Sequence, residues 1–276
     1  MTAAMLLTAC NVKDPIYDTT HPADGKITLT TDWSQIGEGL TAPESYKVCI
    51  GDYTTTVSGA TNTLDRHFAP GTYRMLIHST PENIRFDGTV AEPVFAPDNT
   101  HNPSGLFSYS AEVTISKDTD HAFTAVMKQQ VRQLTLVVEP TGDAADRIER
   151  IMGILGWVAD KFDMENETYL SPIALISDFS KIADGPDAGK WSNIFQTFGF
   201  TQERPISLTL TIFYKDGNPA MQDITSDLTE ALAGFNDNKR EPLTLGSTIV
   251  ETPTEAGFTA TITDWTVVEG DPVVAE

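Results

Sequence analysis

Short segments in which apolar and polar residues alternate are the feature that most restricts the fold of this chain. The clearest segment covers residues 206–214, where every second side chain is apolar or aromatic, and the pair Asp216-Gly217 follows it. A period of two places alternate side chains on opposite faces of a half-buried strand. Asp-Gly after such a run is a strong signal for a tight hairpin turn. We therefore expect a β-hairpin at this position.

Similar segments occur along the whole sequence, and clusters of Gly, Pro, Asn and Asp separate them. They cover residues 26–33, 46–50, 53–57, 71–79, 107–115, 131–138, 153–159, 168–176 and 258–268. Because almost no helical periodicity lies between them, the pattern predicts an all-β fold of antiparallel sandwiches rather than a parallel α/β sheet. Polar capping residues predict two short helices, at 143–151 and 226–234.

The length of 276 residues is comfortable for two domains, each with a sizeable buried core. The polar stretch 116–120 separates two sets of predicted strands and marks the expected boundary. The predicted division is a signal remnant at 1–9, a tether without periodicity at 10–25, an N-terminal β-sandwich at 26–120 and a C-terminal β-sandwich at 121–276.

The net charge of this chain excludes one class of partner. With 18 Lys and Arg against 39 Asp and Glu, the formal charge is −21. A surface this acidic repels phosphate backbones and anionic lipid surfaces. Nucleic acid is therefore not an expected partner.

The N-terminal stretch Met5-Leu6-Leu7-Thr8-Ala9-Cys10 resembles the lipobox of bacterial lipoprotein precursors. The resemblance implies cleavage between Ala9 and Cys10 and attachment of acyl chains such as palmitate to Cys10. The alternative is a chance cysteine after a short apolar run, since no Lys or Arg precedes that run.

The expected lipid is the only membrane attachment that the sequence predicts. No apolar run after Cys10 approaches the ~20 residues of a membrane-spanning helix. Asn11 is not the aspartate associated with retention in the inner membrane, so we expect the outer membrane. If Cys10 is acylated, Cys49 has no partner, and no intrachain disulfide is expected.

A search for catalytic and metal-binding patterns leaves little. The loop 185–191 is one residue too short for a phosphate-binding loop. The carboxylates within 160–167 lack the glycine and spacing of a calcium loop, and the five histidines fall in no metal-ligand spacing. We expect no enzyme activity, no metal and no cofactor. A hydrolase would require two facing carboxylates, which sequence cannot show.

Several short motifs follow one another in the second half of the chain: 195–199 (Phe-Gln-Thr-Phe-Gly), Lys215-Asp216-Gly217, Asp223-Ile224-Thr225 and Thr263-Asp264-Trp265. With the lipobox and the tether, their order resembles the fimbrillin-related lipoproteins of Bacteroidales, near the FimB-type fimbrial anchor and accessory subunits. The resemblance implies two tandem transthyretin-like Greek-key β-sandwiches and a role in cell-surface fimbriae or adhesion.

The same resemblance implies how such a subunit would assemble. Stalk subunits of the superfamily are cut after an arginine in the N-terminal domain and polymerise by strand addition. The first arginine after Cys10 is Arg66, beyond the opening strand, which favours an anchor that keeps its lipid. Other fimbrial subunits are the expected partners, contacted through the strand 258–268 and the tail 269–276.

The alternative function is a surface lipoprotein that binds glycans or host ligands through exposed aromatic side chains. The candidates are Trp33, Trp157, Trp191 and Trp265. Strand tryptophans usually belong to the core, and Trp191, in a Gly-rich loop beside Lys190, is the best of the four.

Overall fold

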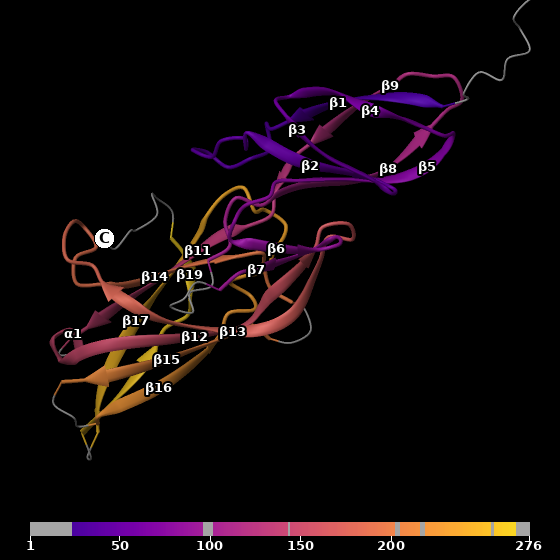
Figure 1. Cartoon of the computed structure of the whole chain (residues 1–276). Coiled ribbons are helices and arrows are strands. Elements are labelled where there is room, and N and C mark those ends of the chain that lie inside the picture. Colours follow the sequence, from indigo (N-terminus) through magenta and orange to yellow (C-terminus); the bar gives the residue numbers. More distant parts are fainter. Residues whose placement is uncertain are drawn as a thin grey trace, which may run out of the picture.

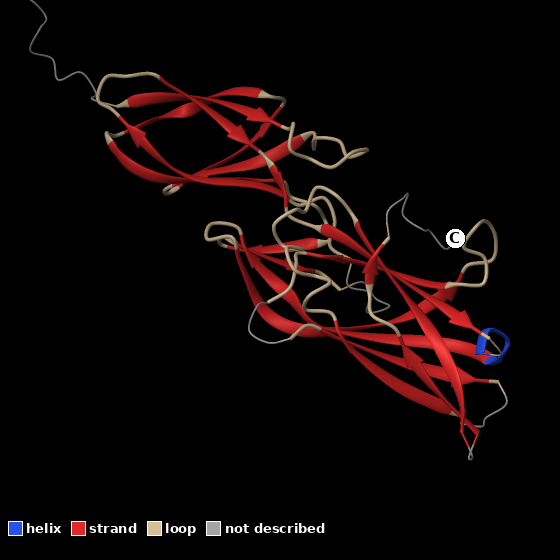
Figure 2. Ribbon diagram, turned by 180° about the vertical axis from the view of Figure 1, so that it is seen from behind, coloured by secondary structure: helices blue, strands red, loops and turns tan. Residues whose placement is uncertain are grey.

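The computed structural model describes residues 24–95, 102–142, 144–201, 205–215, 219–254 and 257–268. Nearly all regular structure in these ranges is strand, which confirms the predicted all-β class (Figure 2). The strands form two lobes, an N-terminal lobe (24–129) and a C-terminal lobe (130–268), joined end to end (Figure 1). The predicted signal remnant, tether and tail lie outside the described residues, as do Ala9, Cys10 and the Asp216-Gly217 turn.

The N-terminal lobe is a sandwich of two sheets. One sheet has the order β4-β1-β9, and the other has the order β10-β8-β5-β2-β3. Their apolar faces enclose one core, to which Ile27 and Leu29 of β1 contribute fully buried side chains. The strands are β1 (Gly25–Asp32), β2 (Ser45–Ile50), β3 (Tyr53–Ser58), β4 (Thr61–Phe68), β5 (Gly71–His78), β8 (Phe107–Ile115), β9 (His121–Val126) and β10 (Lys128–Gln129).

The strand pairing corrects the place assigned to residues 121–129. β9 lies parallel to β1, from Ile27 opposite His121 to Asp32 opposite Val126, and β10 pairs with β8. The polar stretch 116–120 is therefore the turn that leads from β8 into β9, with Asp118 in the left-handed region at φ 53°. The expected boundary at residue 120 falls two short strands too early, before β9 and β10, because a polar turn within a sandwich resembles a linker in sequence.

The C-terminal lobe is one large sheet that curves around its own core. Its strand order is β16-β15-β12-β13-β14-β11-β17-β18, and β19 pairs with β17. The strands are β11 (Arg132–Thr141), β12 (Ile148–Asp163), β13 (Thr168–Lys181), β14 (Trp191–Thr197), β15 (Ser207–Tyr214), β16 (Met221–Asp227), β17 (Leu243–Thr254), β18 (Gly257–Ile262) and β19 (Thr266–Val267). The predicted hairpin is present, with β15 antiparallel to β16.

Neither predicted helix forms as expected. Among the described residues, only α1 (Ala144–Arg147) is helical, and from Ile148 onward the chain continues as β12, whose Ile151 pairs with Ile212 of β15. Residues 229–237 form successive turns, with one backbone bond of helical spacing from Leu232 N to Leu228 O. Burial of apolar side chains within a sheet outweighs weak helix propensity in such short segments.

Within the described ranges, no helix is long and apolar enough to span a lipid bilayer.

One side chain links the two ends of the large sheet. The Gln222 amide of β16 donates from Nε2 to the Ala260 carbonyl at 2.8 Å, and its Oε1 accepts from the Ala260 N–H at 2.9 Å. Ala260 lies in β18, so a side-chain amide takes the place of a neighbouring strand's peptide group there. Strands at the edge of a sheet have unpaired backbone groups and are prone to unwanted pairing. Here β16 and β18 are the two edge strands, and we call the line along which they meet the seam. Gln222 closes the seam by bonding the Ala260 backbone.

We predict that Gln222→Ala destabilises the seam. Removing both hydrogen bonds should lower the free energy of unfolding by about 1–3 kcal/mol, measured by urea denaturation. Hydrogen exchange at the Ala260 amide should accelerate at the same time. Gln196→Ala, which removes only a contact to the Gln133 side chain, should leave that amide unaffected. Unchanged Ala260 exchange in Gln222→Ala would contradict the closing role.

Candidate functional site

A small apolar core joins the two lobes. Phe162 near the end of β12 is 1% exposed, and it packs with Leu76 of β5 and Leu106 from the N-terminal lobe. Phe198 and Val131 of the C-terminal lobe complete the contact. Because these side chains come from both lobes and exclude water, burial of apolar area resists separation of the lobes. We call this group, with Ile84, Ala91 and Met164, the junction core.

A short hairpin extends the large sheet with residues from the first half of the chain. It consists of β6 (Ile84–Asp87) and β7 (Val90–Pro93). β7 pairs antiparallel with the end of β12, placing Ala91 opposite Phe162. The hairpin lies at the junction between the lobes (Figure 1). The lobes are thus joined by strand pairing as well as by apolar packing.

Ion pairs surround the junction core. The turn between β12 and β13 carries Glu165, which pairs with Arg74 of β5 at 3.1 Å. It also carries Glu167, which pairs with Lys128 of β10 at 2.8 Å. These carboxylates belong to the acidic stretch 160–167, and they face cations of the other lobe. Exposed pairs of this kind contribute little stability individually, so the apolar junction core contributes more to holding the lobes together than these pairs do.

The loop 228–242 returns from the C-terminal core to the junction. Asn236 anchors it, because its side-chain amide bonds both the N–H and the carbonyl of Phe200, at 2.9 and 2.8 Å. Arg132 donates to the carbonyls of Phe235 and Glu241, at 2.9 and 2.6 Å. These bonds satisfy backbone groups that would otherwise lack partners in a loop without regular structure.

Gly199 permits the close approach of this loop. A Cβ atom at Gly199 would collide with the Asn236 side chain and with the Tyr169 ring, and the backbone there has φ +145°. Glycine adopts such a conformation without strain. The site therefore depends on the absence of a side chain at this position.

Lys239 is the most unusual residue of the loop. Its side chain is 9% exposed, and its Nζ donates to Gln130 Oε1 at 3.0 Å. The same Nζ lies 4.2 Å from the Phe162 ring centroid and 4.8 Å from that of Tyr169. Aromatic faces attract a cation, but burial disfavours the charged form and lowers the pKa of Lys239 to about 7. Burial also raises the pKa of Tyr169.

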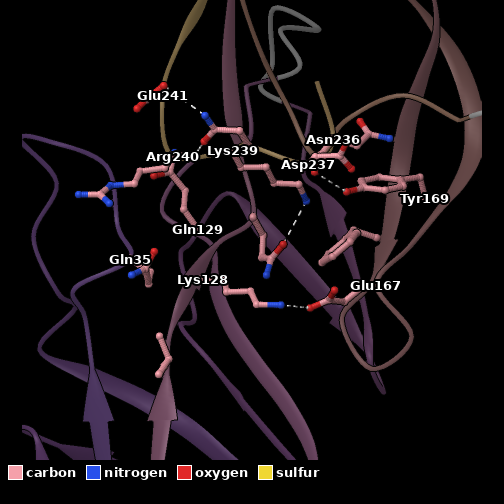
Figure 3. A pocket seen from close by; sticks show the side chains of 14 residues that line it. Gln35, Lys128, Gln129, Glu167, Tyr169, Asn236, Asp237, Lys239, Arg240 and Glu241 are labelled. Carbon is pink, nitrogen blue, oxygen red and sulfur yellow. Dashed lines mark hydrogen bonds and ion pairs between the residues drawn. The ribbon is translucent and has the colours of Figure 1, made fainter. Parts of the chain in front are cut away.

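A cavity of about 850 Å³ opens beside Lys239, between the lobes. The N-terminal lobe contributes Gln35 and Lys128 to its lining. The C-terminal lobe contributes Tyr169, Arg240 and, at its very start, Gln130. Figure 3 shows Lys239 directed into this space and Lys128 held by Glu167, whereas Arg240 extends outward from the rim. The lining is polar and rich in amides and cations, which suits recognition of a ligand through hydrogen bonds.

The cavity holds carboxylates as well as cations. They are Glu167, Asp237 and Glu241. Glu167 pairs with Lys128, and Glu241 accepts from Asn238 at 3.2 Å. Across the described parts of the chain, no group of three or more His, Cys, Asp or Glu side chains could hold a metal ion.

The structure corrects the sequence-based interpretation of Trp191. Its side chain lies at the start of β14, is 6% exposed and belongs to the C-terminal core. Trp265 is similarly buried, and Trp33 packs edge-on against Tyr46 and Phe107. The prediction that Trp191 offers an exposed ring is wrong, because Gly-rich flanking sequence does not reveal that the following strand is central.

Sequence reasoning missed the junction site. Gln130 and Tyr169 come from separate segments, and Asn236 and Lys239 share the loop 228–242; none of the four forms a motif with its sequence neighbours. The only available signal was Lys239-Arg240, a basic pair in an acidic chain. The two predicted lipoprotein residues, Ala9 and Cys10, lie outside the described residues and remain predictions.

No family model matches the sequence, and no curated protein matches it either. Solved structures do resemble the fold over nearly its whole length. A candidate adhesin from Bacteroides ovatus has a TM-score of 0.59 at 19% identity, covering 92% of this chain and 97% of its own. A second candidate adhesin, from Bacteroides thetaiotaomicron, has a TM-score of 0.58 at 12% identity, covering 90% and 99%.

The fimbrial anchor protein Mfa2 from Porphyromonas gingivalis is also similar. Its TM-score is 0.55 at 11% identity, and the match covers 91% of this chain and 99% of Mfa2. Because both chains are covered almost completely, the likeness includes both lobes. At these identities, it establishes a shared fold.

We predict that Lys239 makes stability depend on pH. The folded-state pKa near 7 lies below the ordinary 10.5, so the unfolded chain binds more protons between these values. Stability should therefore rise with pH from about 7 to 10, by at most about 1.4 kcal/mol per pH unit.

Urea denaturation of the wild type and of Lys239→Met at pH 6, 7, 8 and 9 measures this effect. The difference in unfolding free energy, wild type minus variant, should be constant below pH 7 and should increase above it. Lys239→Arg, whose charge cannot be released, should lack the increase as well. Parallel pH profiles for wild type and Lys239→Met would contradict the buried-amine interpretation.

Proposed function

We propose that this protein is a cell-surface adhesion protein that serves as an anchor or accessory structural subunit of fimbriae. The observation that supports the proposal most directly is the full-length likeness to the fimbrial anchor Mfa2, which covers 91% of this chain and 99% of Mfa2. The likeness to the candidate adhesin of Bacteroides ovatus points to the same class. The proposed role is structural and includes no catalytic step.

The arrangement of the lobes suits a protein held at one end. β1 begins at Gly25, at the end of the N-terminal lobe that lies away from the C-terminal lobe (Figure 1). A lipid on Cys10 would attach the protein to the outer membrane through that end. The C-terminal lobe would then face outward, where other subunits are met. The junction core, the β7–β12 pairing and the ion pairs would transmit force between the two ends.

The proposed contact with the next subunit involves the C-terminal strands and the tail 269–276. The single strand expected at 258–268 is divided into β18 and β19. Thr263 lies at the break, where its carbonyl accepts from Ser247 Oγ at 2.6 Å. Val267 and Val268, at the end of this segment, are exposed apolar side chains. An added strand would cover them and would pair with open backbone groups.

In the finer form of the proposal, each lobe is a transthyretin-like Greek-key sandwich.

We predict that Cys10→Ser releases the protein from membranes. Stable anchoring requires more than one acyl chain, and the thiol of Cys10 is the proposed attachment point. The variant should keep its fold, judged by circular dichroism, and should move to the soluble fraction after cell lysis. Cys49→Ser is the matched control and should stay with the membrane. A Cys10→Ser protein that still sediments with membranes would refute the lipid-anchor proposal.

We also predict that the tail contributes to subunit contact. After gentle detergent extraction from the native membrane, the full-length protein should co-purify with fimbrial subunits identified by mass. Deletion of residues 269–276 should reduce that co-purification without lowering the unfolding temperature of the isolated protein. Equal recovery of subunits with the truncated chain would exclude a part for the tail, and recovery of none with the full chain would exclude the fimbrial role.

A further inference from the structure

The floor of the junction cavity presents two buried donors with unused hydrogen-bonding capacity. Lys239 is 9% exposed and Gln130 is 4% exposed, and both line the cavity. The Lys239 ammonium has three N–H groups, one of which is directed to Gln130 Oε1. Nε2 of Gln130 has no hydrogen-bond partner among the described residues. Because both residues line the cavity, these N–H groups can be satisfied by an acceptor of a ligand that enters it.

The cations of the cavity are only partly neutralised. Lys128 is paired with Glu167, whereas Lys239 forms an ion pair with no carboxylate in the described parts of the chain. Arg240 extends from the rim with its guanidinium exposed, and within the same ranges it has no side-chain partner. The carboxylate without a side-chain partner is Asp237, on the side of the cavity near Tyr169 (Figure 3). One cation at the floor and one at the rim therefore remain available to a ligand.

The remaining lining suits a ligand with many hydroxyl groups. The Gln35 side-chain amide at the rim can both donate and accept. The Tyr169 hydroxyl donates to the Asn236 carbonyl at 3.3 Å and retains its acceptor capacity. A cavity of about 850 Å³ is far larger than a single inorganic ion requires and lies within the range of small-molecule sites. The net charge of −21 opposes the approach of polyanions.

From these observations we propose that the junction cavity binds a singly charged acidic sugar, a hexuronic acid unit, whose carboxylate contacts Lys239 and Gln130. The sugar hydroxyls meet the amide side chains and the Tyr169 hydroxyl, and Arg240 closes the rim. A neutral sugar can still accept hydrogen bonds through its hydroxyl oxygens, but it offers no negative charge to the Lys239 ammonium. The site therefore discriminates by charge. The inference does not depend on fimbrial assembly or on lipidation, since it concerns the described residues of the isolated chain.

Isothermal titration calorimetry with the full-length protein at pH 6.5 tests the proposal. The probes are methyl glucuronide and methyl glucoside, which differ in the carboxylate. We expect the glucuronide to bind at least tenfold more tightly than the glucoside. Lys239→Met should reduce glucuronide affinity at least tenfold, and the exposed Lys117→Met, in the turn before β9, should leave it unchanged. Equal binding of both sugars, or no binding of the glucuronide at 10 mM, overturns the proposal.

A second variant keeps the test decisive if Lys239→Met does not fold. Arg240→Gln changes an exposed side chain whose loss should not disturb the loop, because the bonds that fix the loop come from Asn236 and Arg132. Its unfolding temperature should match that of the wild type, and its glucuronide affinity should fall at least threefold. Unchanged affinity in a folded Arg240→Gln protein overturns the assigned geometry. The glucuronide titrations use the isolated protein and do not require the Cys10 lipid. Absence of glucuronide binding would therefore overturn the sugar-binding proposal without bearing on the fimbrial proposal.

Discussion

The packing of Phe162 against both lobes is the contact on which the rest of the molecule depends. Its ring lies 6.0 Å from Phe198 and 5.4 Å from Tyr169, and its backbone pairs with Ala91 of β7. The same side chain therefore joins the junction core, the hairpin β6–β7 and the aromatic pair around Lys239. Aromatic side chains bury large areas and hold preferred relative orientations. Truncating Phe162 would weaken the apolar contact between the lobes and remove part of one wall of the cavity.

Lys239 places a polar element beside this apolar junction. A buried amine has to be compensated by a partner or by release of its proton, and here an amide oxygen and two rings supply partial compensation. The loop that carries Lys239 is fixed through Asn236 and Arg132, which bond backbone groups rather than other side chains. The loop thus has a defined position without regular secondary structure. The junction is consequently both a mechanical link and a shaped, polar cavity.

The two lobes contribute different properties. The N-terminal lobe is a sandwich of two separate sheets whose first strand begins at its outer end, whereas the C-terminal lobe is a single curved sheet whose ends meet at Gln222 and Ala260. The two lobes are connected by the pairing of β7 with β12 and by the junction core. The ion pairs Arg74–Glu165 and Lys128–Glu167 also connect the two lobes at the junction.

The sequence by itself determined the all-β class, the strand at 206–214 and the alternation that buries Ile27 and Leu29, because a period of two is a local property of a strand. It did not determine where β9 would pair, that Ile148–Asp163 would form one long strand, or that Trp191 would be buried. Those outcomes depend on which strands become neighbours in a sheet. Because neighbouring strands can come from distant parts of the chain, a local sequence pattern does not reveal them. The junction site has the same origin: Gln130, Phe162, Tyr169 and Lys239 are unremarkable in their own segments. Only the tertiary structure brings an amine, an amide and two rings together, because the return of the loop 228–242 between the lobes is decided by contacts far apart in sequence.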